Sequence, residues 1–184
     1  MESKPNFGQI QVYWGNGKGK TTASLGLALR MLGRGFNVHL VQFMKFGIEA
    51  NKNFDETGEI TALKKFDNFS YKRFGIKKWV IGKPSQEHLA EAKKALNHSI
   101  KSVSSGSFDL VIVDEILYAI QLELIKEEDV LKLMDSKNEK TELVLTGSHK
   151  PFEKIFEKAD LVSEIKKHNH PFDKGIIARK GVEF

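Results

Sequence analysis

The stretch Trp14-Gly15-Asn16-Gly17-Lys18-Gly19-Lys20-Thr21-Thr22 lies between an apolar run typical of a strand and a run with helical spacing. Its glycines allow the backbone to curl so that successive N–H groups point at an anion. The following helix adds its unpaired N–H groups and positive dipole end. Lys20 supplies a mobile charge, and the Thr21 hydroxyl suits Mg²⁺. The stretch predicts a phosphate-binding loop, although Trp14 replaces the first glycine of the usual G-x-x-x-x-G-K-[ST] pattern.

Acidic residues follow a second buried strand. Asp114 and Glu115 come directly after Leu110-Val111-Ile112-Val113, a run that suits a strand buried on both faces. An acid at the carboxyl end of such a strand lies beside the ligand in a parallel sheet and can hold Mg²⁺. An ordinary acidic pair at a helix N-terminus is the alternative interpretation.

The candidate site follows from these two segments. Gln42 and Lys45 end another strand and are placed either to reach the ligand or to lie in a solvated loop, and Asn16 either contacts phosphate or stabilises the turn. We expect Lys20 and Glu115 to be catalytic, and Thr21, Asp114 and Glu115 to hold the metal. The expected ATP ligands are Gly15, Asn16, Gly17, Lys18, Gly19, Lys20, Thr21, Thr22, Gln42 and Lys45.

The alternation of patterns along the chain predicts one α/β domain over residues 1–184, with a mainly parallel sheet and helices on both faces. Strands are expected at 9–14, 36–43, 69–74, 109–114, 143–146, 161–165 and 176–178. Helices are expected at 25–32, 85–103, 127–134 and 151–158, the second capped by Ser85.

Composition bounds the class of protein. The 184 residues include 40% hydrophobic and 29% charged residues, as in globular proteins, and no cysteine, which excludes disulfides and thiolate chemistry. No apolar run approaches the length of a membrane span, and Met1 to Gly8 lacks a signal-peptide core, so the expected location is the cytoplasm. The net charge of +5 comes from residues 64–83, which hold seven Lys or Arg residues and one acid.

Several segments together resemble the ATP:corrinoid adenosyltransferases of the cob(I)yrinic acid a,c-diamide type, and the likeness runs from about Gly8 to Phe184. The C-terminal segment, residues 170–184, is similar to that family's ending almost residue for residue. The other matching segments are residues 15–22, Val41-Gln42-Phe43-Met44-Lys45, Asp109 to Glu115, Thr146-Gly147 and Ala159 to Glu164.

The resemblance implies a RecA-like fold, a homodimer and transfer of the adenosyl group from ATP to Co(I) of a reduced corrinoid, with triphosphate as the other product. It also implies Mg²⁺ as cofactor and a triphosphate reversed relative to most phosphate-loop enzymes. The implied corrinoid is cob(I)alamin or cob(I)yrinic acid a,c-diamide, and a reductase is a further implied partner. Phe74 and Trp79 occupy the region of the family's corrinoid-facing aromatics.

The chain departs from the family pattern in three places. Ser148 follows Thr146-Gly147 where family members often have arginine, the N-terminal segment is shorter, and no Gly-Phe-Thr-Trp stretch occurs. Two lesser expectations concern the C-terminal segment: Phe172 packs in the core, and His168 and His170 have surface or hydrogen-bonding roles.

Two other functions fit the same residues. A kinase or RecA-like ATPase would use the same loop and strand acid for γ-phosphoryl transfer. A nucleic-acid-binding protein would use the basic segment 64–83, where aromatic residues alternate with lysines as stacking surfaces require. We expect no membrane partner, and adenosyl transfer is the preferred function.

Overall fold

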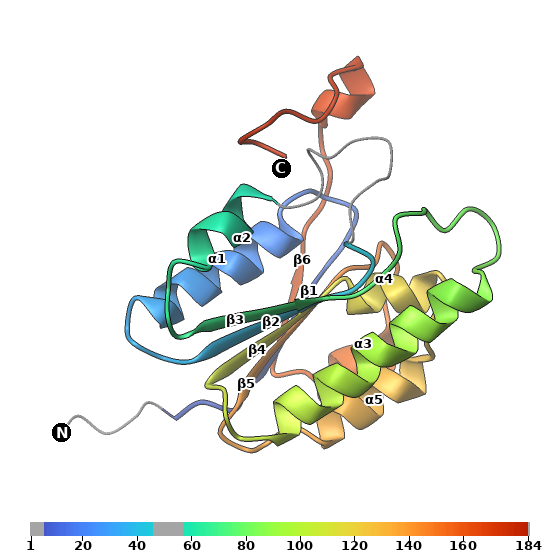
Figure 1. Cartoon of the computed structure of the whole chain (residues 1–184). Coiled ribbons are helices and arrows are strands. Elements are labelled where there is room, and N and C mark those ends of the chain that lie inside the picture. Colours follow the sequence, from blue (N-terminus) through green and yellow to red (C-terminus); the bar gives the residue numbers. More distant parts are fainter. Residues whose placement is uncertain (1–5, 46–56, 184) are drawn as a thin grey trace.

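The structure, a computed structural model, describes residues 6–45 and 57–183, and these residues form an α/β fold around one parallel sheet (Figure 1). The sheet order is β3-β2-β4-β5-β1-β6 and every pairing is parallel. The strands are β1 (Ile10–Trp14), β2 (Val38–Gln42), β3 (Phe69–Arg73), β4 (Leu110–Asp114), β5 (Glu142–Thr146) and β6 (Leu161–Glu164).

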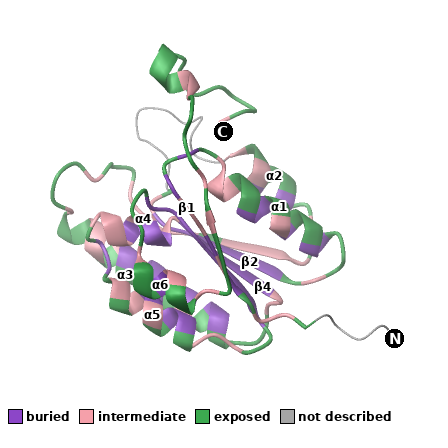
Figure 2. Cartoon of the chain, turned by 180° about the vertical axis from the view of Figure 1, so that it is seen from behind, coloured by how far each residue is buried: buried purple, intermediate pink, exposed green. Residues whose placement is uncertain are grey.

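Helices cover both faces of the sheet, because the central strands are apolar on both sides. One face carries α1 (Lys20–Leu32) and α2 (Gly58–Leu63), and the cluster there includes Leu40, Ile112 and Val144. The other face carries α3 (Gln86–Ser104), α4 (Ile116–Gln121), α5 (Glu127–Asp135) and α6 (Glu153–Lys158). Figure 2 shows that the buried residues concentrate in the inner strands and in the helix faces that meet them.

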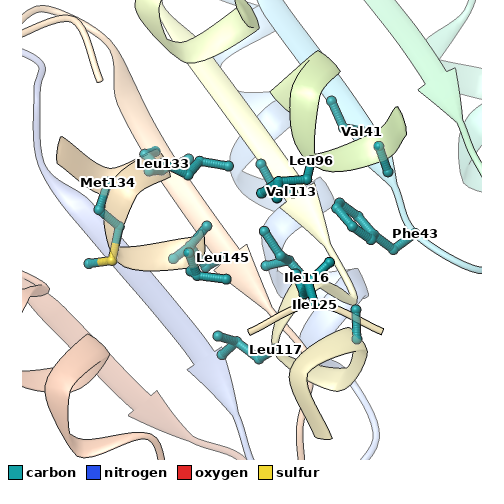
Figure 3. Close-up of a cluster of buried hydrophobic side chains, with 14 of the residues drawn as sticks. Val41, Phe43, Leu96, Val113, Ile116, Leu117, Ile125, Leu133, Met134 and Leu145 are labelled. Carbon is teal, nitrogen blue, oxygen red and sulfur yellow. The ribbon is translucent and has the colours of Figure 1, made fainter. Parts of the chain in front are cut away.

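Alternate residues of each inner strand enter different cores. On β4, Val111 and Val113 belong to the cluster under α3 and α5, whereas Leu110 and Ile112 belong to the cluster under α1. Figure 3 shows Val113 and Leu145 from neighbouring strands beside Leu96 and Leu133 of the covering helices. Because side chains alternate along a strand, a continuous apolar run is what a sheet covered on both faces requires.

The expected order of elements is confirmed up to residue 164, with two additions. Helices α2 and α4 were not predicted, since each has six residues and too little sequence to show a helical period. Ser85 caps α3 as expected, and its hydroxyl accepts a hydrogen bond from the His88 N–H. Three parts of the expected domain lie outside the described residues: residues 1–5, 46–56 and 184.

Two expectations for the C-terminal segment are wrong. Residues 176–178 form no strand, and Ile177 is 79% exposed, because these residues lie beyond the edge strand β6 and pair with no described strand. Phe172 is 72% exposed and lies in a 3₁₀ turn over Pro171–Lys174, not in the core. Apolar side chains predict burial only where the topology supplies a surface to cover them.

Because helices cover both faces of the inner strands but not of the edge strand β6, leucines of the same sheet should contribute differently to the free energy of unfolding. Leu145→Ala removes a fully buried side chain from β5, and we expect it to lower the free energy of unfolding by about 2–5 kcal/mol. The matched control is Leu161→Ala on β6, where the side chain is 43% exposed, and its loss should be under about 1 kcal/mol. Urea unfolding curves measure both, and equal losses would contradict this description of the core.

Candidate active site

The phosphate loop between β1 and α1 is held against the segment that follows β6. The Gly17 N–H donates to the Ile165 carbonyl over 2.7 Å, and the side-chain oxygen of Asn16 accepts from the Lys167 N–H over 2.9 Å. Gly15 has φ of 110°, and a Cβ there would lie 2.4 Å from the Ile165 carbonyl oxygen. The loop therefore needs glycine at this position, and the Asn16 side chain contacts the segment that follows β6.

Lys20 lies inside the loop that it terminates. Its Nζ donates to the carbonyls of Gly15 and Gly17, over 2.7 and 2.8 Å. Burial lowers the pKa of Lys20, and the charge of Lys45 lowers it further, while Glu115 and Asp114 oppose the shift. These four charged side chains therefore share one region at the carboxyl ends of the strands.

Asp114 connects three elements at that edge of the sheet. It is fully buried, and its Oδ1 accepts hydrogen bonds from the hydroxyls of Thr21 (2.9 Å) and Thr146 (2.6 Å). Its Oδ2 accepts from the amide of Gln42 over 2.9 Å. Gln42 thus lies at this edge of the sheet, where its amide contacts the acid that also binds Thr21.

Glu115 directly follows Asp114, has a left-handed backbone with φ of 63°, and contacts different partners. Its carboxylate forms a 3.0 Å ion pair with Lys45, and its N–H donates to the Thr146 hydroxyl. Burial opposes the charge on Lys45, but the carboxylates of Glu115 and Asp114 outweigh it and raise the pKa of Lys45 above its usual value. Lys45 is therefore a fixed cation of the site.

A cavity of about 290 Å³ lies next to this charged group, and Lys45 and Glu115 form part of its wall. Most of the remaining lining is apolar, and it includes both aromatic residues singled out in the sequence, Phe74 and Trp79. The other lining residues are Phe43, Met44, Gly75, Ile76, Lys78, Val80, His88, Glu91, Ala92, Ala95, Tyr118, Leu122 and Leu124. The structure thus brings a charged phosphate loop and an apolar recess to one edge of the sheet.

The C-terminal segment reaches back to the phosphate loop, which Figure 1 shows as the red end of the chain above β1 and β6. Lys18 donates to the Glu183 carboxylate over 2.7 Å and to the Val182 carbonyl over 3.2 Å. Hydrogen bonds from Arg179, and then from Lys18, lower the pKa of Glu183 to about 2. Lys18 therefore has a partner within the chain, which the local glycine pattern gave no sign of.

The remaining residues of interest differ in their position relative to the charged side chains of the site. Thr22 is exposed one residue beyond Thr21, and the His170 Nδ1 accepts from the Phe172 N–H in the C-terminal segment. Thr146 was not predicted as a site residue, although its position at the end of a buried strand was available as a signal. Across residues 6–45 and 57–183, no three His, Cys, Asp or Glu side chains group to hold a metal, and no helix could span a membrane.

Comparison with known proteins agrees with this geometry. The profile of the family described as ATP:corrinoid adenosyltransferase BtuR/CobO/CobP matches residues 6–184. The corrinoid adenosyltransferase of Escherichia coli K12 is 30% identical over 186 residues, covering 100% of this chain and 89% of that protein. The chain belongs to the ATP:corrinoid adenosyltransferase family, which confirms the family and the enzyme function expected from the sequence.

Other similar proteins differ in their sequence identity to this chain or in the share of their length that it covers. A corrinoid adenosyltransferase of Sinorhizobium sp. is 32% identical, covering 96% of this chain and 80% of that protein. An uncharacterized protein of Nostoc sp. is 29% identical over 95% of this chain, which spans only 48% of that relative. The crystal structure of flagellar accessory protein FlaH from Methanocaldococcus jannaschii has a TM-score of 0.55 at 15% identity, covering 86% of this chain and 72% of that one. This last likeness concerns the fold alone and confirms the RecA-like class.

The contact between Lys18 and Glu183 gives a prediction for ATP. Glu183→Gln removes the charge that competes with triphosphate for Lys18, so we expect the KM for ATP to fall about two- to fivefold. Asp135→Asn is the matched control, because it breaks the exposed Lys158 ion pair between α5 and α6. Initial rates over a range of ATP concentrations measure both variants. An unchanged or higher KM in Glu183→Gln would show that the pair does not compete with the substrate.

Proposed function

We propose that this chain transfers the 5′-deoxyadenosyl group of ATP to the Co(I) centre of a reduced corrinoid and releases triphosphate. In the reaction the cobalt electron pair forms the bond to C5′, and the electrons of the broken C5′–O bond leave with the triphosphate. The protein needs no nucleophile of its own for this step, and the chain has no cysteine. Its task is to bind two substrates side by side and to stabilise the leaving group.

The observation that carries this proposal is the junction between the loop and the cavity. Lys45 and Glu115 line the cavity and also affect the pKa of Lys20 in the phosphate loop. A molecule in the cavity therefore lies beside the nucleotide site and not on another face of the protein. A γ-phosphoryl transfer enzyme needs the far end of the triphosphate exposed, whereas this arrangement places an apolar acceptor site beside the loop.

The leaving group decides which residues matter for the rate. Triphosphate carries about four negative charges, so the site needs concentrated positive charge where it departs. Lys18, Lys20, Lys45 and the N-terminus of α1 supply this charge. Lys20 now donates to two loop carbonyls, and we propose that phosphate oxygens replace them when ATP binds.

The oxygen ligands of the site fit Mg²⁺, which prefers oxygen and commonly takes one or two protein ligands beside phosphates and waters. The Thr21 hydroxyl donates a hydrogen bond to Asp114, so its oxygen lone pairs remain available to a cation. We propose that Thr21 and Glu115 hold the ion. Asp114 accepts hydrogen bonds from Thr21, Thr146 and Gln42, so we propose that it orients Thr21 and does not bind the ion itself. When bound, Mg²⁺ would neutralise part of the triphosphate charge.

We further propose that the chain acts as a single domain, as a homodimer in the cytoplasm, and receives Co(I) through a separate reductase. The family membership supports the substrates, ATP and cob(I)alamin or cob(I)yrinic acid a,c-diamide. The apolar cavity supports binding of a corrinoid in place of a nucleic acid.

A turnover assay with ATP, Mg²⁺ and chemically reduced corrinoid tests the function through its products. We expect adenosylated corrinoid and triphosphate in equal amounts, and no triphosphate without the corrinoid. Lys20→Ala should lower kcat/KM at least about 100-fold, because it removes a charge facing the leaving group. Glu115→Ala should mainly weaken activity at low Mg²⁺ and recover in part at high Mg²⁺.

The same assay has a clear contrary outcome. Steady release of ADP without corrinoid, and no adenosylated product, would favour the kinase or ATPase alternative. Full activity in both Lys20→Ala and Glu115→Ala would show that the loop is not the active site.

The cavity gives a separate prediction for the corrinoid. Trp79 lines the cavity with 69% of its surface exposed, so Trp79→Ala removes apolar contact area available to a large planar substrate. We expect the corrinoid KM to rise about tenfold while the KM for ATP stays within twofold. Ile81→Ala is the matched control, because Ile81 is 88% exposed on the same loop but does not line the cavity. Equal effects of the two variants would contradict the role of Trp79.

A further inference from the structure

The cavity wall nearest solvent is an irregular loop. Residues 74–85 connect β3 to α3, and Phe74, Ile76, Trp79 and Val80 from this loop line the cavity. Within residues 6–45 and 57–183, no backbone-to-backbone hydrogen bond joins residues 75–84 to the rest of the protein. Contacts from side chains to the main chain of this loop therefore contribute to its shape.

Two side chains from α3 hold this main chain from the other side of the cavity. The His88 Nε2 lies 3.1 Å from the Lys78 carbonyl oxygen, next to Trp79. Glu91 accepts from the Gly75 N–H over a longer 3.4 Å, and its other oxygen pairs with Lys94 over 2.6 Å. His88 and Glu91 themselves line the cavity, one helical turn apart.

The hydrogen-bond partners of His88 indicate which tautomer of its imidazole fits this position. The Lys78 carbonyl can only accept, so Nε2 carries the proton. The Ser85 N–H can only donate, so Nδ1 is the acceptor, and it also lies 2.7 Å from the Ser85 hydroxyl. One imidazole therefore completes the cap of α3 with one nitrogen and holds the cavity loop with the other.

We propose that His88 is a positioning residue for the corrinoid: its Nε2–H bond to Lys78 holds residues 74–80, and with them Trp79, against the apolar cavity. This proposal rests on the proposed function of that cavity. In this proposal His88, a residue of α3, affects the affinity for the corrinoid without contacting the reacting atoms. No residue of the phosphate loop lines the cavity, so ATP binding should not depend directly on the bond between His88 and Lys78.

The test separates the two tasks of His88 by substitution. His88→Glu keeps an acceptor at the third helix position, as an ordinary capping box has, but cannot donate to Lys78. His88→Gln keeps both an acceptor and a donor and serves as the conservative rescue. Ser85→Ala removes the capping hydroxyl and leaves the bond to Lys78, so it controls for helix stability.

Steady-state kinetics give the first measurement. We expect His88→Glu to raise the corrinoid KM about tenfold, with the KM for ATP and the saturated kcat within about twofold, and His88→Gln to restore the corrinoid KM. Ser85→Ala should lower the melting temperature by about 2–4 °C without raising the corrinoid KM. An equal rise in Ser85→Ala, or a His88→Gln variant as impaired as His88→Glu, would overturn the proposal.

Fluorescence of Trp79 without substrate gives the second measurement, and it does not depend on the proposed function. Acrylamide quenching of Trp79 should rise at least about 1.5-fold in His88→Glu and return in His88→Gln, with Trp79→Phe measured in parallel to subtract Trp14. Unchanged quenching in His88→Glu would overturn the proposal. If quenching rises but even the wild-type chain adenosylates no corrinoid, the anchor stands and the proposed function fails.

Discussion

The carboxylate of Asp114 has no exposed surface, and a charge in that position is tolerated only when its lone pairs accept hydrogen bonds. Thr21, Thr146 and Gln42 supply those bonds, from α1, β5 and β2 respectively. Removing any one donor would leave the buried charge partly unsatisfied. The first turn of α1, and so the phosphate loop, is thereby fixed to the sheet at the point where the reaction is proposed to occur.

The next residue shows why the order Asp-Glu matters. The carboxylate of Asp114, at the end of β4, accepts hydrogen bonds from Thr21, Thr146 and Gln42, whereas the carboxylate of Glu115 forms an ion pair with Lys45. One acid therefore organises the loop, while the other faces both the nucleotide site and the cavity. Lys45 remains charged beside Glu115, and burial lowers the pKa of Lys20, so the two lysines differ although they share the same acids.

The sequence predicts the parts of this protein whose signal is local. The runs before Asp114 and Thr146 are apolar on both faces, and they appear as inner strands in the expected places. Short elements such as α4 give no period, and they follow from tertiary contacts that one sequence does not display. Within residues 64–83, Phe74 and Trp79 line the cavity, whereas Phe66, Phe69 and Tyr71 pack against the core on the α1 face. No local pattern distinguishes these two roles, because the cavity is completed by residues of α3 further along the chain.

The structure of the C-terminal segment was predicted wrongly for a related reason. Its two isoleucines are residues that favour strands. However, β6 is the edge strand of the sheet, and within the described part of the chain no strand pairs with residues 176–178. Here the resemblance to a family predicted that the segment matters, while its local pattern predicted the wrong structure. Glu183 and Lys18 are 165 positions apart, and only the turn of the chain after β6 brings them together.

The site therefore combines fixed and exchangeable contacts. The bonds to Asp114 are buried, and breaking them would cost the loop its connection to the sheet. The pair of Lys18 with Glu183 is exposed, and the carbonyls bound by Lys20 belong to the loop itself, so both cations can exchange these partners for phosphate oxygens at low cost. A leaving group must be held in the transition state and then released, and this division allows the cations to change partners while Asp114 keeps the geometry in place.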